Sequence, residues 1–222
     1  MDFQEWEPYY RQILLDFGYE GAMDQASAEL LQAISTKLSL CDETCLRKRM
    51  GREVDICGNS PGLDYELEEE LLAGPVIAAG SATETLMDFG IVPDMIFSDL
   101  DGYVEAEIEA NANGAIAVIL AHGDNMGLIS KWAPRFKGSV MLTCQCRPFG
   151  MLRNYGGFTD GDRAVMTARH LGVRTIRLHG FDFSNPRSKP GSSAEIKIKK
   201  LAWAKRIIYE LNTADVRLVE HG

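Results

Sequence analysis

The sequence predicts an α/β protein: a mostly parallel, doubly wound sheet of about six to seven strands with helices on both faces, preceded by a helical amino-terminal segment. From residue 53 onward, short apolar runs alternate with amphipathic helical patterns, which is the order that βαβ units produce. Sheets built from such units are parallel and have both faces covered by helices. Before residue 50, apolar residues recur at helical spacing. We therefore divide the chain into a helical subdomain, residues 1–50, and an α/β domain, residues 51–222.

The amino-terminal segment is predicted to form two helices. The first ends at Gly18, and the second runs from about Met23 to Leu40. Cys41-Asp42 interrupts the helical pattern, and a short basic turn, Arg47-Lys48-Arg49, is expected after it. No strand is expected before Glu53. The apolar faces consist of Trp6, Tyr9, Tyr10, Ile13, Leu14 and Phe17 in the first helix, and of Ala26, Leu30, Leu31, Ile34 and Leu38 in the second.

Strands and helices are expected to alternate through the α/β domain. The strands are predicted over residues 54–57, 76–79, 95–97, 116–120, 140–142, 175–178 and 216–219. The helices are predicted near residues 63–72, 82–89, 103–112, 125–136, 160–171 and 194–211. Open parallel sheets bind their ligands beyond the carboxyl ends of the strands, so the residues that follow each strand are the candidate site.

Composition and charge narrow the class of ligand. The chain has 222 residues, a formal net charge of −9 and one dense basic stretch, Lys197–Lys200, so nucleic-acid binding is not expected. An acidic protein that binds a polyanion normally needs a divalent cation as intermediary, which favours a metal–nucleotide. The apolar runs are too short to cross a membrane, and the acidic amino terminus does not resemble a signal peptide. A cytoplasmic protein is expected.

The five cysteines are expected to be reduced, partly buried thiols. Cys41 with Cys45, and Cys144 with Cys146, are the pairs that a zinc site would use. Neither pair has the two-residue gap usual in such sites, which argues against zinc.

Acidic residues follow the predicted strands at several points. Asp99 and Asp101 come after residues 95–97, and residues two apart at an extended strand end point the same way. Two such carboxylates repel each other unless a cation such as Mg²⁺ relieves the repulsion. Asp124, after the neighbouring strand, and Asp160 are expected to complete the cluster. The alternative is a turn in which Asp99 or Asp101 caps the next helix.

Glycine-containing turns and a histidine follow other strands. Backbone N–H groups in the turns at Gly58-Asn59 and Gly80-Ser81 can hold a phosphate. The first turn matches neither the Walker A loop nor the dinucleotide fingerprint, so an ordinary tight turn stays open. His122, which lies between a strand end and Gly123-Asp124, is expected to contact a phosphate oxygen or to donate a hydrogen bond. His179, which also follows a strand and precedes a glycine, is a weaker candidate for such a contact.

Arg187 and Lys189 lie in a loop over residues 184–193 that is rich in serine and proline. A basic loop of this kind can close over a triphosphate and neutralise charge in a phosphoryl-transfer transition state. The alternative is a solvated surface loop.

Four motifs stand out in the α/β domain. They are Asp94-Met-Ile-Phe-Ser-Asp99-Leu-Asp101-Gly102, Ala121-His122-Gly123-Asp124-Asn125, Gly156-Gly157-Phe158-Thr159-Asp160-Gly161-Asp162-Arg163-Ala164 and Gly180-Phe181-Asp182-Phe183. In order and spacing they resemble the archaeal 6-hydroxymethyl-7,8-dihydropterin diphosphokinases, and the amino-terminal Phe3-Gln-Glu-Trp6 fits as well. The resemblance implies a Mg²⁺-dependent enzyme of pterin cofactor (folate or methanopterin) biosynthesis, which transfers diphosphate from ATP to a pterin alcohol and releases AMP.

The residues and the resemblance together assign roles. The expected catalytic residues are Asp99, Asp101, His122 and Asp124, and the expected metal ligands are Asp99, Asp101, Asp124 and Asp160. The expected ATP-binding residues are Gly58, Asn59, Gly80, Ser81, Asn125, Thr159, Asp160, Asp162, Arg187 and Lys189. Asp162 or Asp182 is expected to pair with the amino-pyrimidine edge of the pterin.

Three other functions stay open: a thiamin diphosphokinase, a non-catalytic Mg²⁺–nucleotide module, and a sugar-nucleotide transferase that uses Asp99-x-Asp101. The family resembles thiamin diphosphokinases in its catalytic domain, but those carry an acid where this chain has Gly157. Many relatives also place an Asp-Gly where this chain reads Ala79-Gly80-Ser81. These departures disfavour thiamin. A homodimer is compatible with the sequence, which does not indicate an oligomeric state.

Overall fold

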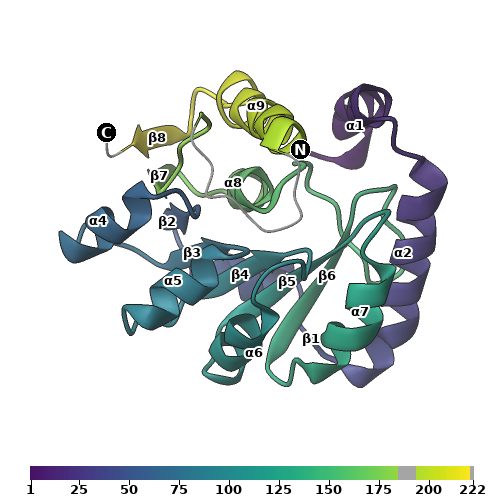
Figure 1. The fold of residues 1–222 in the computed structure, drawn as a ribbon, viewed down its shortest axis with the longest axis horizontal. Helices are drawn as coiled ribbons and strands as arrows, with labels where there is room; N and C mark the ends of the chain where they lie inside the picture. The colour runs from purple at the N-terminus through teal and green to yellow at the C-terminus, as the bar shows by residue number, and fades with distance from the viewer. Residues whose placement is uncertain (185–193, 221–222) are drawn as a thin grey trace.

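The computed structural model describes residues 1–184 and 194–220. These residues form one eight-stranded sheet of order β1-β6-β5-β4-β3-β2-β7-β8, in which each neighbouring pair is parallel (Figure 1). The predicted α/β class is confirmed, and the sheet is parallel throughout. The strands are β1 (Ser39–Leu40), β2 (Glu53–Cys57), β3 (Val76–Ala79), β4 (Met95–Ser98), β5 (Ile116–Ala121), β6 (Ser139–Cys144), β7 (Thr175–His179) and β8 (Arg217–Glu220).

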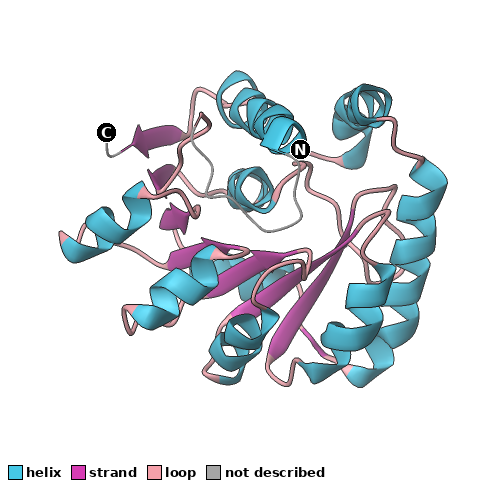
Figure 2. Cartoon of the chain, viewed as in Figure 1, coloured by secondary structure: helices cyan, strands magenta, loops and turns pink. Residues whose placement is uncertain are grey.

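Helices cover both faces of the sheet (Figure 2). The helices are α1 (Phe3–Phe17), α2 (Gly21–Ile34), α3 (Glu43–Met50), α4 (Gly62–Glu68), α5 (Ala82–Asp88), α6 (Val104–Ala112), α7 (Met126–Trp132), α8 (Asp160–His170) and α9 (Ala194–Glu210). Apolar clusters place α3, α8 and α9 on one face, and α2, α4, α5, α6 and α7 on the other. Helix α1 packs on the outer side of α8 and α9 through Trp6, Met166 and Trp203.

The alternation of side chains along each strand builds these two layers. In β5, Ile116 and Val118 belong to the cluster under α8, whereas Ala117, Ile119 and Ala121 belong to the cluster under α2 and α7. Both sets are buried, which is why the predicted strands are continuous apolar runs rather than alternating ones. Because the strands are parallel, the residues that follow β2, β3, β4 and β5 meet at one edge of the sheet.

Two predictions for the amino-terminal segment are wrong. Ser39–Leu40 is a strand, β1, which pairs with β6 at the sheet edge; two residues are too few to show a periodicity of two. The expected basic turn at residues 47–49 is the last turn of α3, which begins where the Asp42 side chain accepts a hydrogen bond from the Cys45 N–H. Basic side chains in a last turn are favourable because they face the negative end of the helix dipole.

Three helix boundaries also differ from expectation. Helix α2 ends at Ile34, before a short 3₁₀ turn over Ser35–Lys37. Helix α4 ends at Glu68, because the chain turns through Glu70, whose φ is +53°. The predicted helix over residues 125–136 is divided into α7 and a 3₁₀ turn, Ala133–Arg135, that contains Pro134.

Among the described helices, none combines the length and the apolar character that spanning a membrane requires.

Candidate active site

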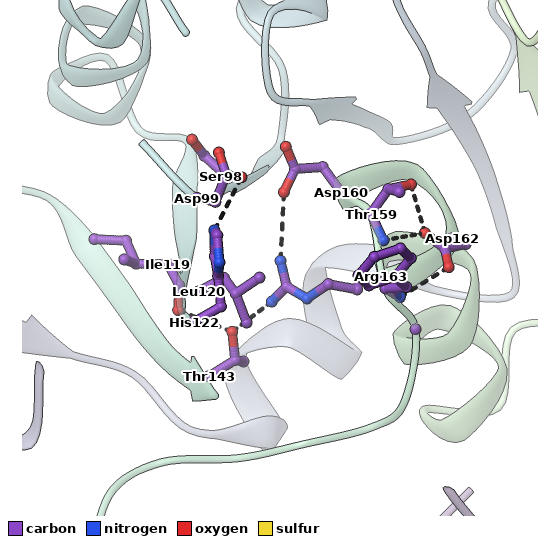
Figure 3. Close-up of polar contacts among 12 residues, drawn as sticks. Ser98, Asp99, Ile119, Leu120, His122, Thr143, Thr159, Asp160, Asp162 and Arg163 are labelled. Atoms are coloured by element: carbon purple, nitrogen blue, oxygen red, sulfur yellow. Dashed lines mark hydrogen bonds and ion pairs between the residues drawn. The ribbon is translucent and has the colours of Figure 1, made fainter. Parts of the chain in front are cut away.

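The predicted acids lie at the carboxyl edge of the sheet, where two strands end beneath the start of a helix (Figure 3). Asp99 follows β4 and His122 follows β5. Helix α8 packs across β2, β3 and β4, and its first residue, Asp160, lies at this edge. Gly80 permits that approach: it has φ +50°, and a Cβ added to it would lie 2.7 Å from Asp160 Oδ2. The topology therefore brings Asp99, His122 and Asp160 together as predicted.

His122 links two of the acids. Its Nε2 lies 3.3 Å from Asp99 Oδ2, and its Nδ1 lies 2.9 Å from Asp124 Oδ1. Burial alone would lower the pKa of His122, but the hydrogen bonds and negative charges of Asp124 and Asp99 outweigh burial and raise the pKa to about 9. At neutral pH the imidazole is therefore a cation that donates hydrogen bonds from both nitrogens.

Asp99 is held in place by the turn that follows β4. Its Oδ1 accepts a hydrogen bond from the Asp101 N–H at 3.2 Å, and the intervening Leu100 has a left-handed φ of +67°. Ser98 Oγ accepts the Leu100 N–H and donates to Glu107 Oε1, which fixes this turn against α6. Burial would raise the pKa of Asp99, but the hydrogen bond and charge of His122 outweigh it, so the pKa lies well below its usual range. Asp99 is thus a fixed anion.

Asp160 stands opposite Asp99 and is paired with a buried cation. Arg163, one helical turn later, has its NH1 3.4 Å from Asp160 Oδ1 and donates from NH2 to Thr143 Oγ1. Thr143 Oγ1 in turn donates to the Ile119 carbonyl, so this chain of contacts ties α8 to β5 and β6 (Figure 3). Burial, and then repulsion by Asp99, raises the pKa of Asp160 well above its usual value despite Arg163. Ionisation of Asp160 beside Asp99 is therefore unfavourable unless a further cation is bound.

Thr159 and Asp162 form the capping box that begins α8. Asp162 Oδ1 accepts hydrogen bonds from the Thr159 N–H and Oγ1, both at 2.6 Å, and Oδ2 accepts from the Phe158 N–H at 2.8 Å. Asp162 is fully buried. Its oxygens are committed to the backbone, so the geometry supports a role in holding Asp160 in place rather than contact with a nucleotide or a pterin.

Asn125 has a similar supporting place. Its Oδ1 accepts the His122 N–H at 3.1 Å, and its Nδ2 donates to the Leu120 and Asp99 carbonyls at 2.7 and 3.0 Å. The side chain is buried and joins the two strand exits that carry Asp99 and His122. The structure shows its contacts with the loops after β4 and β5. Its contact with phosphate stays a prediction.

The two glycine-containing turns lie next to each other after β2 and β3. Asn59 Nδ2 donates to the Ser81 carbonyl and to Ser81 Oγ at 3.1 and 3.0 Å, which joins the turns. A Cβ at Gly58 would lie 2.8 Å from the Gly180 carbonyl. These contacts place Gly58, Asn59, Gly80 and Ser81 at the same edge as the acids, and their phosphate-binding role stays a prediction.

The remaining predicted residues lie less centrally. Asp101 is exposed, and Asp124, with 89% of its side chain exposed, is on the far side of His122 from Asp99. Among residues 1–184 and 194–220, no three His, Cys, Asp or Glu side chains form a ready-made metal cage. Arg187 and Lys189 lie outside the described residues.

Two residues of the site were not predicted. Arg163 lies three residues after Asp160, a spacing that places both on one helix face, so the sequence carried a signal for it. Thr143 is the last residue but one of β6, and the sequence carried no such signal for it.

Comparison with known proteins shows which family the chain belongs to. The family model described as 6-hydroxymethylpterin diphosphokinase MptE-like matches residues 29–188. A 6-hydroxymethyl-7,8-dihydropterin pyrophosphokinase of Methanocaldococcus jannaschii is 38% identical to this chain, and the match covers 94% of the chain and 95% of that protein. This chain therefore belongs to the MptE-like 6-hydroxymethylpterin diphosphokinase family. Proteins of the same name from Pyrococcus furiosus and Methanothermobacter thermautotrophicus are 36% and 37% identical, and the matches cover 99% and 98% of this chain and 99% of each of theirs.

A solved structure outside the family has a similar fold. The MAf glycosyltransferase from Magnetospirillum magneticum AMB-1 superposes with a TM-score of 0.51 at 19% identity, over 78% of this chain and 33% of that chain. At this identity the likeness concerns the fold alone.

Proposed function

We propose that this protein is a 6-hydroxymethyl-7,8-dihydropterin diphosphokinase. The observation that carries the proposal is the convergence of Asp99, His122 and Asp160 at the carboxyl edge of the sheet, in a chain that belongs to the pterin diphosphokinase family. In the proposed reaction the pterin hydroxymethyl oxygen bonds to the β-phosphorus of ATP. The bond from that phosphorus to the α–β bridging oxygen breaks, AMP leaves with this oxygen, and the hydroxyl proton is released.

The acids fit a magnesium ion. Asp99, Asp101 and Asp160 supply carboxylate oxygens, the donors that Mg²⁺ takes. Burial and the neighbouring charges of Asp99 and Asp101 raise the pKa of Asp160, and a divalent cation removes this repulsion. When bound there, the ion would neutralise charge on the phosphates of ATP. We infer that Asp99, Asp101 and Asp160 hold it, with Asp124 outside this set because it lies beyond His122.

The protein's own groups position the reactants. Asp99 is fixed by His122 and by the turn through Leu100, and Asp160 by the capping box and Arg163. Because Asp124 and Asp99 raise its pKa to about 9 in the protein without metal, His122 is protonated there at neutral pH and acts as a hydrogen-bond donor and a positive charge. Fixed charges of this kind speed phosphoryl transfer by positioning and by stabilising developing charge.

The structure also supports pterin over thiamin. Thiamin diphosphokinases carry an acid two residues before the Thr of their Thr-Asp pair, and this chain has Gly157 there. Gly157 has φ +95°, and a Cβ added to it would lie 2.6 Å from the Arg163 Cα. A side chain does not fit at this position without moving α8. The thiamin arrangement is therefore incompatible with the way α8 begins in this protein.

An acceptor assay tests the proposal. The purified protein is incubated with Mg²⁺ and ATP, with 6-hydroxymethyl-7,8-dihydropterin, with thiamin, or with neither, and AMP is measured. AMP that appears with the pterin alone is the expected result. AMP with thiamin alone would transfer the assignment to that substrate, and no AMP with either would refute diphosphoryl transfer. We also propose that the enzyme acts in the cytoplasm, where ATP is available, and gel filtration with light scattering would test whether it is a homodimer.

A further inference from the structure

A buried acid from the amino-terminal helices reaches the loop that carries His122. Asp24 in α2 is 5% exposed, and its Oδ1 accepts a hydrogen bond from the Gly123 N–H at 2.7 Å. Its Oδ2 accepts a hydrogen bond from the Tyr10 hydroxyl of α1 at 2.5 Å. Asp24 thus joins α1, α2 and the loop between β5 and α7, although 99 residues separate it from Gly123.

This loop is held from two sides. On its inner side, the Asn125 side chain accepts a hydrogen bond from the His122 N–H and donates to the carbonyls of Leu120 and Asp99. On its outer side Gly123 is so close to α2 that an added Cβ would lie 3.2 Å from the Met23 Cβ and 3.4 Å from Asp24 Oδ1. Helix α2 also packs along α7 and against β5 and β6, the elements around the loop (Figure 1).

Docking of α2 does not require a carboxylate at this position. Ala28 and Leu31 already bury the apolar face of α2 against the cluster under α7. A buried acid costs free energy that an apolar residue would not, because it loses its hydration. Burial raises the pKa of Asp24 above its usual value, although the hydrogen bonds from Tyr10 and Gly123 and the charge of His122 oppose this. A buried acid that is costly for stability and that holds the loop carrying His122 points to a functional role.

We propose that Asp24 is a positioning residue for diphosphoryl transfer, which acts through the Gly123 N–H to keep His122 between Asp99 and Asp124. The proposal rests on the proposed function and extends it, because Asp24 and Tyr10 precede the segment that the family model matches, which begins at residue 29. The amino-terminal helices are then part of the active site and not an appendage to it.

Steady-state kinetics of AMP release test the proposal with matched variants. Asp24→Ala removes both acceptors and should lower kcat about 10- to 100-fold, as the loss of a supporting contact does at other sites, with the KM for ATP changed less than about threefold. Asp24→Asn keeps an oxygen that can accept from Gly123 and should restore kcat to within about fivefold of the wild type. Asp24→Leu keeps the branched shape of the Asp side chain, with four heavy atoms, and is apolar. This variant is used if the alanine variant does not fold.

Leu31→Ala is the matched control. Leu31 is buried in the same helix, so its truncation loosens α2 without touching Gly123. At a temperature where each variant is folded, Leu31→Ala should keep kcat within about threefold of wild type, as expected for a residue that only docks the helix. If Asp24→Ala and Asp24→Leu keep kcat within threefold, or lose no more than Leu31→Ala, the positioning role is refuted.

A measurement without substrate separates this inference from the proposed function. The Gly123 amide should exchange with solvent at least about tenfold faster in Asp24→Ala or Asp24→Leu than in wild type, while the Ile129 amide in α7 is unchanged. In Leu31→Ala the Gly123 amide should keep its protection. If the wild type releases no AMP with the pterin, the proposed function fails, and the exchange rates alone decide whether Asp24 holds the loop. Unchanged exchange at Gly123 would overturn the inference regardless of activity.

Discussion

Two histidines in this protein lie at the carboxyl edge of the sheet, at the ends of strands that three other strands separate, and each links two acids. His122, after β5, lies between Asp99 and Asp124. His179 ends β7, with Nε2 2.9 Å from Asp55 Oδ1 and Nδ1 2.8 Å from Glu66 Oε2. Each group is a histidine between two carboxylates, and the surroundings of the two groups give them different uses.

The His179 group is closed. His179 is 0% exposed, and the other oxygens of its acids are taken by backbone amides: Asp55 Oδ2 by those of Ala73 and Gly74, and Glu66 Oε1 by that of Gly180. It ties β2, α4 and β7 together. By contrast, the His122 side chain is 22% exposed and lies in an acidic cluster with Asp101 and Asp160 nearby. A closed group stabilises the fold, whereas an open group with surplus negative charge can bind a cation.

The largest expected effect is a loss of activity when an acid of the open His122 group is replaced. Asp101→Asn should lower AMP release at least about 10³-fold, because several kcal/mol of charge stabilisation are lost with a metal ligand. Asp101 is exposed, so the melting temperature should change little. The rate of AMP release and the melting temperature, measured on the same preparation of the variant, check the two expectations. A variant with full activity would remove Asp101 from the site and weaken the contrast between the two groups.

The second-largest expected effect is a loss of stability when the closed His179 group is disrupted. His179→Ala leaves Asp55 and Glu66 buried without their shared hydrogen-bond partner and should cost about 3–5 kcal/mol in urea unfolding. The matched change, His122→Ala, should cost less stability than His179→Ala, because Asp124 is solvated, and should lower activity about 10- to 100-fold. Equal losses of stability in the two variants would show that the His122 group is structural as well.

The pH dependence of stability provides a smaller effect. The pKa of His122 is raised from an unfolded value near 6.5 to about 9, so the folded state binds its proton more tightly. This contribution to stability is fully present below pH 6.5 and is lost as the pH rises to 9. Without added metal, the free energy of unfolding of wild type should therefore fall more steeply between pH 6.5 and 9 than that of His122→Gln. Parallel curves would show that the pKa of His122 is not raised.

The comparison also shows what the sequence can predict. The seven strands from β2 to β8 were predicted to within two residues, because β3 to β6 contain runs of apolar residues, β2 and β7 carry apolar residues at alternate positions, and β8 has a pair of adjacent apolar residues. Strand β1 was missed because its two residues owe their conformation to pairing with β6. Asp99 and Asp160 were found because a parallel sheet brings its strand exits to one edge whatever the packing details.

Other roles depend on the direction of a side chain, which sequence position alone does not determine. Asn125 and Asp162 were expected to face a ligand, and the structure turns both inward onto backbone groups. Asp24 went unnoticed because its partner Gly123 becomes its neighbour only when α2 packs beside α7. His122 and His179 have similar local sequences, His-Gly followed by a segment with an aspartate, so their separate uses follow from the burial of the acids around them.

The smallest expected effect concerns Asp124, which was predicted to bind the metal. The structure places it beyond His122, with its side chain 89% exposed, and its pKa is lowered mainly by the hydrogen bond to His122. Asp124→Asn should therefore lower AMP release about tenfold or less, with no change in the melting temperature, since the site loses one support of His122 and no ligand. Measuring the Mg²⁺ concentration for half-maximal activity distinguishes the two roles. A supporting residue leaves this concentration nearly unchanged, whereas a large increase, comparable to that in a variant of Asp99, would make Asp124 a metal ligand and require its side chain to turn inward when the cation binds.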